Sequence, residues 1–429
     1  MNIDPAATAW LLAATAMVLL MTPGLAIFYG GMVRSSGVLN MLMMSFISIP
    51  LVTVVWLVTG YSLAFGDDAG GGLIGNLGHF GLSGIDPTTV HAGSGIPELL
   101  FVTFQLTFAI LTVALVSGAI ADRAKFSAWM IFVPVWALIV YAPIAHWVWT
   151  PDGWLASFGT LDYAGGLVVE IASGASALAM AIVLGPRIGF KVDAMRPHNL
   201  PFVLLGAGLL WFGWFGFNAG SALAANGTAA AVFLNTLVAG CLGMLGWLIV
   251  EQVRDGRPTT FGAASGAVAG LVAITPSCGS VNTMGALIVG VVAGTVCSFA
   301  VGWKFKGGYD DSLDVVGVHF VGGIVGTLLI GFLANRAMTG AGGPEGLLYG
   351  GGLGQLGKQL VGVIAVAAFA FGMSFALGKV IDRTIGFRVS REDEIGGIDF
   401  ALHAETAYAE GVNGHGHQVK RMGEGPFGH

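Results

Sequence analysis

Charged side chains are scarce in this sequence of 429 residues: they make up 10% of it, whereas hydrophobic residues make up 55%. Soluble domains typically carry about 25% charged residues, so this chain has too little charge to cover a surface exposed to water. The 18 Lys and Arg residues are outnumbered by 24 Asp and Glu, which gives a net charge of -6. Without a basic patch for phosphates, nucleic-acid binding is disfavoured. We therefore expect a polytopic helical membrane protein.

Cysteine is also rare. The three cysteines, Cys241, Cys278 and Cys297, are too few for a disulfide framework or a CxxC metal site, and we expect them to be buried thiols. The first ten residues contain no basic side chain, so they lack the start of a cleavable signal and the first helix should be retained. Glycine, in contrast, is abundant, with 69 residues, and small residues allow membrane helices to pack closely.

Long hydrophobic runs predict eleven membrane-spanning helices, because a bilayer core of about 30 Å needs roughly 20 apolar residues. They lie at about 8–31, 40–65, 97–121, 126–147, 163–185, 200–219, 228–250, 259–278, 283–303, 314–334 and 355–381. The loops on one side then hold 16 of the 18 Lys and Arg residues, and the other side holds only Arg336 and Lys358. This asymmetry predicts an outside N-terminus and a cytoplasmic C-terminus. Residues 1–381 form the membrane domain and residues 382–429 a cytoplasmic tail.

Two ionisable residues fall inside the spans, Glu170 in the fifth and His319 in the tenth. Asp162 precedes Glu170 by eight residues, and Asp311 precedes His319 by eight. Eight residues of helix rise about 12 Å, so both groups should lie near the bilayer centre, reached from opposite faces. The match is typical of a five-plus-five inverted repeat with its site at the midplane, which leaves the eleventh helix outside the repeat.

These four residues have two interpretations. Glu170 and His319 form either a functional pair on a proton or ion path or interhelical hydrogen bonds that only stabilise the fold. Asp162, and Asp311 or Asp314, stand where a carboxylate caps the first N–H groups of a helix. We favour the functional interpretation for the pair and the structural one for the aspartates.

Aromatic residues gather at the predicted outer ends of the third, fourth and sixth spans: Phe104 and Phe108, Trp149, and Phe217 with Ser221. Aromatic faces beside a hydroxyl group would bind a small cation, but composition alone favours an interfacial belt. The outer loop 66–96 contains three aspartates and ten glycines, which either attract cations or form a solvated connector.

Several motifs along the chain resemble those of the ammonium transporter family, with its fungal Mep and animal Rhesus relatives. They are PGLAIFYGG in the first span, TFQLTFAI at 103–110, DYAGG at 162–166, WFGFNAGSA at 214–222, GVHFVGGIVG at 317–326 and RVSREDEIGGIDFALHAETAY at 388–408. The resemblance covers nearly the whole chain. It implies a homotrimer in the plasma membrane, the inner membrane of a bacterium, in which each protomer has its own pore.

The resemblance also implies the roles of individual residues. Phe108, Trp149 and Ser221 match the family's outer ammonium site, with Phe104 as a further aromatic, and this overturns the belt interpretation. The stacked pair Phe108 and Phe217 matches the gate below that site. Asp162 matches an aspartate that supports the site and assists deprotonation.

His319 matches the second of two pore histidines, whereas Glu170 stands in place of the first, as an acid does in some fungal relatives. We therefore expect transport with altered pH dependence. Ammonium would lose its proton at the gate, and ammonia would pass the Glu170–His319 pair. The rival functions are an ammonium sensor that signals through its tail and an electroneutral gas channel. A PII-type protein is a possible cytoplasmic partner. No nucleophile motif, metal-ligand set or phosphate loop accompanies the pair, so we expect neither an enzyme nor a cofactor.

Overall fold

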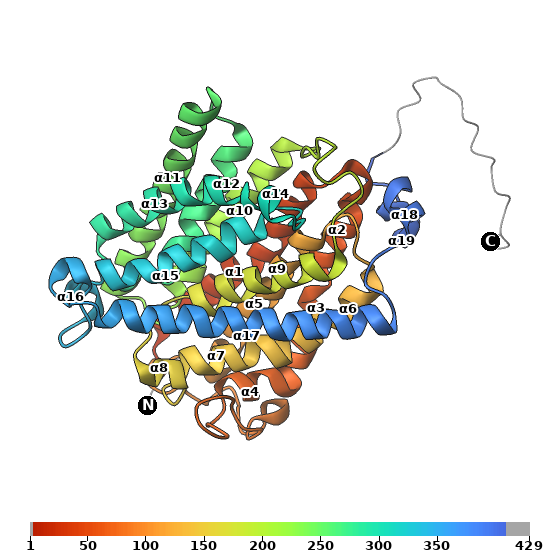
Figure 1. Cartoon of the computed structure of the whole chain (residues 1–429). Coiled ribbons are helices and arrows are strands. Elements are labelled where there is room, and N and C mark those ends of the chain that lie inside the picture. Colours follow the sequence, from red (N-terminus) through yellow and green to blue (C-terminus); the bar gives the residue numbers. More distant parts are fainter. Residues whose placement is uncertain (1–2, 409–429) are drawn as a thin grey trace.

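The computed structural model describes residues 3–408, and these residues form a bundle of helices (Figure 1). Within residues 3–408 there are four isolated antiparallel bridges but no strand. Ten helical segments in this range are long and apolar enough to cross a membrane. The all-helical membrane fold expected from the composition is therefore confirmed.

The first half of the chain contributes five of the long segments, and each overlaps a predicted span. The fourth segment, Phe126–Phe158, continues well past the predicted end at 147. Their parts are α1 (Pro5–Met32); η1 (Ser35–Gly37), α2 (Val38–Phe46), α3 (Ser48–Val55), η2 (Trp56–Gly60) and α4 (Tyr61–Phe65); α5 (Glu98–Val116) and η4 (Ser117–Ile120); α6 (Phe126–Trp136), η5 (Ala137–Tyr141), α7 (Ala142–Trp149) and α8 (Trp154–Phe158); and η6 (Gly166–Ile171) with α9 (Ala172–Leu184). Segments η2, η5 and η6 are π-helical. A short 3-10 turn, η3 (Phe80–Leu82), lies in the loop after α4.

The second half contributes the other five long segments. They are α10 (Leu200–Gly220); α11 (Gly227–Asp255); α13 (Thr283–Ala300) with α14 (Trp303–Gly307); η7 (Val316–Phe320) with α15 (Val321–Leu333); and α17 (Gly354–Thr384). The remaining elements are α12 (Thr260–Ile274), α16 (Arg336–Thr339), η8 (Leu347–Tyr349), α18 (Arg391–Gly396) and α19 (Ile398–His403).

The predicted span at 259–278 is where the structure departs from the expected count. Its helix, α12, has only 15 residues, fewer than the roughly 20 that a crossing usually needs. The chain continues from Thr275 to Ser280 as turns rather than as helix. The predicted span therefore extended past the helix into buried turn residues, which include the polar Thr275, Ser277 and Ser280. Within residues 3–408, ten long segments, not eleven, meet the length expected of a span.

Close helix packing uses the abundant glycines. Helix α1 lies along α10, and α11 packs on α12 and α13. A Cβ atom at Gly294 would lie 2.0 Å from the carbonyl oxygen of Gly243, and one at Gly270 would lie 2.1 Å from that of Ala239. No larger side chain fits at either position, so glycine allows these backbones to approach, as the composition predicted.

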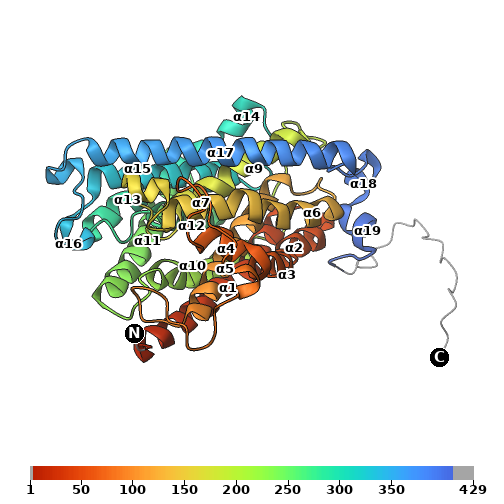
Figure 2. The same ribbon diagram turned by 90° about the horizontal axis from the view of Figure 1, so that it is seen from below.

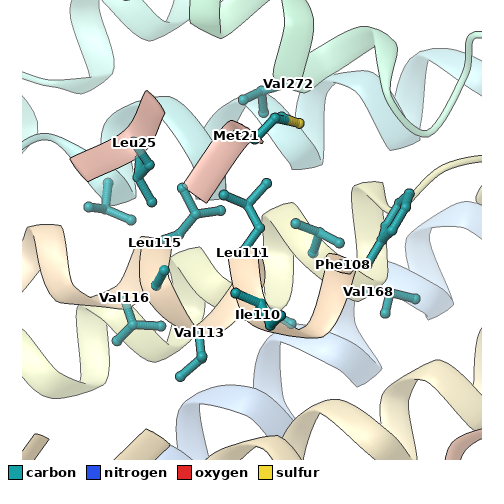
Figure 3. Packing of buried hydrophobic residues seen from close by; sticks show 14 of the residues in the cluster. Met21, Leu25, Phe108, Ile110, Leu111, Val113, Leu115, Val116, Val168 and Val272 are labelled. Atoms are coloured by element: carbon teal, nitrogen blue, oxygen red, sulfur yellow. The ribbon is translucent and has the colours of Figure 1, made fainter. Parts of the chain in front are cut away.

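Helix α17 runs along one side of the bundle, where it packs on α9 and α15 (Figure 2). Around α5, hydrophobic side chains fill the space towards α1, with Phe108, Leu111 and Leu115 on α5 and Met21 and Leu25 on α1 (Figure 3). Cys278 and Cys297 are buried as expected, but Cys241 is only half-buried, because it lies on a face of α11 that is partly open.

The described part of the tail folds back onto the loops at one end of the bundle. The N–H of Val389 donates to the carbonyl of Arg123, and the N–H of Lys125 donates to that of Phe387. The carboxylate of Asp399 accepts hydrogen bonds from the N–H groups of Leu39 and Asn40, at 2.9 and 2.8 Å. Residues 409–429 of the predicted tail lie outside the described residues.

Candidate functional site

Glu170 and His319 meet in the interior of the bundle. Nδ1 of His319 lies 2.7 Å from Oε2 of Glu170, and both side chains are buried. Their contact confirms that equal depth from opposite ends brings the two groups together. A hydrogen bond between two buried titratable groups makes them one coupled unit for proton exchange.

The aspartates eight residues upstream cap the helices that carry this pair. The carboxylate of Asp162 accepts four backbone N–H bonds, from Gly165, Gly166, Leu167 and Val168, at 2.6–3.2 Å. This capping confirms the structural interpretation of Asp162, and Gly165 adopts φ of 125°, which accounts for a glycine in the DYAGG motif.

In the second half, Asp311 caps in the same way, with bonds from Val315 and Val316 at 3.1 and 2.7 Å. Asp314, the other candidate, binds Lys304 instead. Both caps precede π-helical turns, η6 and η7, which hold Glu170 and His319. The extra residue in a π turn is frequent at functional sites, and hydrophobic periodicity gave no sign of it here.

The aromatic residues expected at the outer end form one cluster. The rings of Phe108 and Phe217 are stacked with centroids 4.1 Å apart, and Phe104 contacts Phe108 edge-on at 4.9 Å. Trp149 meets Phe108 edge-on at 5.9 Å, and its Nε1–H donates to the carbonyl of Asp162 at 3.1 Å. The hydroxyl of Ser221 donates to the carbonyl of Phe217 at 2.8 Å. Phe217 has no exposed surface, so the stacked rings close the floor of this cluster.

A cavity of about 200 Å³ lies against this cluster and is lined by Phe104, Phe108, Trp149 and Ser221. Its other lining residues include three polar ones that sequence reasoning did not single out: His91, Gln105 and Tyr163. Oε1 of Gln105 and the hydroxyl of Tyr163 are buried and make no hydrogen bond within residues 3–408. Unsatisfied buried acceptors favour a cationic donor in the cavity. Their signal in the sequence was only that Gln105 stands between Phe104 and Phe108.

The aspartates of the outer loop are engaged locally. The carboxylate of Asp86 accepts hydrogen bonds from the N–H groups of Thr88 and Thr89, and that of Asp68 accepts one from Gly72. Desolvation alone would raise the pKa of Asp68, but backbone hydrogen bonds and the contact with His146 together outweigh it, so the pKa of Asp68 lies below its usual value. These two aspartates therefore support the interpretation of the loop as an ordered connector.

At the opposite end, a buried ion network joins three loops. Arg187 donates to both carboxylate oxygens of Asp310 at 2.9 Å and contacts Asp122 at 3.4 Å. Arg123 donates to the carbonyl of Asp310 at 2.7 Å. Burial alone would raise the pKa of Asp310, but the hydrogen bonds and charge of Arg187 outweigh it, and the pKa of Asp310 lies below its ordinary value of 3.8.

Comparison with known proteins connects this geometry to one group of proteins. The model of the Ammonium Transporter Family matches residues 9–408. The chain is 55% identical to the ammonium transporter of Mycobacterium tuberculosis strain H37Rv, over 94% of this chain and 90% of that protein. The crystal structure of Saccharomyces cerevisiae Mep2 is similar with a TM-score of 0.85 and 35% identity, over 91% of this chain and 89% of that one. A structure described as Sensor Amt Protein has a TM-score of 0.85 and 30% identity, over 93% of this chain and 98% of that chain.

Proposed function

The chain belongs to the ammonium transporter family and is a multi-pass membrane protein, and from this premise we propose how it moves ammonium. The ion is captured in the outer cavity, loses its proton at the stacked rings of Phe108 and Phe217, and crosses the hydrophobic interior as ammonia. The proton follows through Glu170 and His319. Transport is then electrogenic.

Capture rests on chemistry that distinguishes ammonium from potassium of similar size. The faces of Phe108 and Trp149 attract any small cation, but ammonium also donates hydrogen bonds. The Ser221 hydroxyl has given its own hydrogen to Phe217, so its oxygen is left as an acceptor for the ion. Ammonium can also release a proton, with a pKa of about 10 like that of a lysine amine, and potassium cannot.

Asp162 takes part as a positioning residue. Its carboxylate is occupied by four N–H groups and its carbonyl holds the indole of Trp149, which supports the outer site without direct contact with the ion. The negative charge of this carboxylate favours a cation above the gate. Because the same charge opposes loss of the proton, Asp162 assists the deprotonation step only by holding Trp149 and the backbone of the outer site in place.

One observation carries the proposal above all: the 2.7 Å contact between Glu170 and His319 in the buried centre. Where the family usually has two histidines, this chain pairs a carboxylate with a histidine. A carboxylate can hold and pass a proton. We infer that Glu170 is part of the path of the proton.

The test is the transient current after an ammonium concentration jump on proteoliposomes, recorded for wild type, Glu170→Ala and Glu170→Gln. We expect a current for ammonium and none for a matched potassium jump, and a loss of the current in both variants, because neither replacement can carry a proton. Size-exclusion chromatography checks that each variant is folded. A current of wild-type size in folded Glu170→Ala would remove Glu170 from the charge path. Silent wild type with a measurable ammonia flux would indicate the electroneutral gas channel.

A sensor role is the second candidate, favoured by the similarity to the Sensor Amt Protein and by the contact of the tail with the bundle through Asp399. Wild type that binds ammonium but carries neither current nor ammonia would support the sensor role.

The resemblance to the family also supports finer proposals about topology, oligomeric state and a partner. The short α12 is the eighth of eleven crossings, which form a five-plus-five repeat with one added helix. The N-terminus is outside, the protein is a homotrimer, and a PII-type protein docks on the cytoplasmic face.

A further inference from the structure

The inner end of the protein holds an ammonium group of its own. Nζ of Lys304, on α14, donates to Oδ1 of Asp314 at 2.7 Å and to the carbonyl oxygen of Asp311 at 2.9 Å. It also lies 5.5 Å from the centre of the Phe305 ring. A carboxylate, a carbonyl and an aromatic face are groups that bind an ammonium cation. These three groups therefore surround a primary ammonium, which belongs to the side chain of Lys304.

This site lies next to the exit of the proposed path. Lys304, Phe305 and Asp314 line a cavity of about 240 Å³. Asp314 also lines a much smaller cavity that reaches His319. A molecule that passes His319 towards this end therefore meets Asp314 next. Asp314 adopts φ of 64°, a conformation that is uncommon for residues other than glycine and that the surrounding structure must hold.

The other charges around the larger cavity do not compete for this position. Arg187 is bound to Asp310 and Asp122 in the buried network. Lys191 and Asp193, which also line this cavity, are exposed. Among the lining groups of this cavity, Asp314 is the carboxylate that holds a lysine ammonium, and only 16% of its side chain is exposed.

We propose that Asp314, the carbonyl of Asp311 and the ring of Phe305 form a second ammonium-binding site, at the inner mouth, and that Lys304 occupies it as a tethered competitor. The inference deepens the proposed function, on which it rests, because it concerns the product after it leaves the path. A tethered group has an effective local concentration in the millimolar range or above. Free ammonium below that level is excluded, so the product does not accumulate at the exit.

Binding is tested on the full-length protein in detergent by the rise in melting temperature with ammonium chloride, since a ligand of the folded state stabilises it. The variants are Lys304→Met, which removes the competitor, and Lys304→Met with Asp314→Asn, which also removes the site. Lys306→Met is the matched control, because Lys306 is an exposed residue on the same short helix. Potassium chloride at the same concentrations controls for ionic strength.

We expect the apparent dissociation constant for ammonium to fall at least about tenfold in Lys304→Met, and to return to the wild-type value in the double variant and in Lys306→Met. The outer site is present in all four proteins, so it cancels in the comparison. Equal responses of wild type and Lys304→Met would overturn the proposal. Potassium that stabilises Lys304→Met as strongly as ammonium does would also overturn it, since the site would then be a general cation site.

A chemical rescue keeps the proposal testable if Lys304→Met does not fold. Lys304→Cys is treated with 2-aminoethyl methanethiosulfonate, which restores a tethered ammonium, or with the neutral ethyl reagent, and wild type is treated in parallel for its own cysteines. Only the amine should suppress the added ammonium binding; suppression by both reagents would contradict the role of the charge. Because binding is measured without transport, a wild type that fails to transport refutes the proposed function and leaves this inference standing on its own result.

Discussion

The two halves of the molecule contain the same capped π-helical turn, at opposite ends of the bundle, but the side chains around the two caps differ. In each half an aspartate caps a π-helical turn, and a titratable residue follows eight positions later: Asp162 with Glu170, and Asp311 with His319. At the first end the cap lies beneath aromatic rings, and its carboxylate contacts only backbone N–H groups. At the second end the cap lies beside Lys304 and the Arg123–Arg187 network.

Under the proposed function, this difference would let one scaffold serve entry at one end and exit at the other. A cluster of rings around a carboxylate, without a basic side chain in contact, leaves room for a cation from solution. At the other end, the basic side chains of Arg187 and Lys304 already bind the carboxylates of Asp310 and Asp314. The repeated backbone fixes the depth of the central pair, and the side chains around each cap decide which charge can occupy the mouth.

Replacing the two caps gives the largest expected effect and tests whether they are equivalent. Asp162→Ala leaves four N–H groups without an acceptor, whereas Asp311→Ala leaves two. At a minimum of about 1 kcal/mol for each unsatisfied donor, the expected losses in unfolding free energy are about 4 and 2 kcal/mol. We expect Asp162→Ala also to abolish methylammonium uptake. Alanine keeps the backbone carbonyl that accepts from Trp149, but the segment that positions this carbonyl loses its four side-chain hydrogen bonds. Equal melting temperatures for the two variants would contradict this ranking.

The inner ion network predicts the next largest effect. Asp310→Asn leaves the buried Arg187 with only the longer contact to Asp122, which should cost about 3 kcal/mol of unfolding free energy. Because the pKa of Asp310 is lowered on folding, its stabilisation is complete at neutral pH and is lost as the pH falls below about 4. Wild type should therefore lose stability faster than Asp310→Asn on acidification, as measured by denaturation at several pH values. Parallel pH curves would count against this assignment.

A moderate effect is expected at the outer aromatic cluster. Trp149→Leu removes a cation–π contact worth about 1.4 kcal/mol in a partly desolvated site. The ammonium concentration that gives half-maximal current should rise about tenfold, while potassium still gives none. Trp147→Leu is the matched control on α7, because Trp147 donates to the carbonyl of Leu73 and does not line the cavity. A rise of similar size in both variants would indicate a general loss of packing.

Ser221→Ala should give the smallest effect. It removes one neutral acceptor from the outer site, and such a hydrogen bond is worth about 1 kcal/mol, or roughly a fivefold rise in the half-maximal ammonium concentration. Ser221→Thr keeps the hydroxyl group and should stay close to wild type. If Ser221→Ala matched wild type as well, the ion would be held by the rings and by another acceptor, for which Gln105 is a candidate because it also lines the cavity.

The sequence was sufficient to predict the positions that depend on backbone length. The rise per residue and the direction of each span place Glu170 and His319 at one depth, and the structure joins them at 2.7 Å. The capping role of Asp162 also followed from its place before a helix. Both inferences need only local geometry and the width of a bilayer.

The remaining features depend on contacts between distant segments. The π-helical turns at Glu170 and His319 do not disturb the hydropathy pattern, and α12 is shorter than its apolar run. The packing of α5 against other helices decides that Gln105 lines a cavity and that its buried Oε1 has no hydrogen-bond partner within residues 3–408. Lys304, likewise, was counted only as a positive charge of a loop, because its contact with Asp314 requires the turn that follows α14.

The central hydrogen bond has a further consequence for how the protein is made. Glu170 and His319 are 149 residues apart in the chain, and at a synthesis rate of 5–20 residues per second the second residue emerges about 7–30 s after the first. During that interval the first half resides in or beside the bilayer with an acid that has no partner. The hydrogen bond between Glu170 and His319 therefore forms only after the second half of the chain has been inserted.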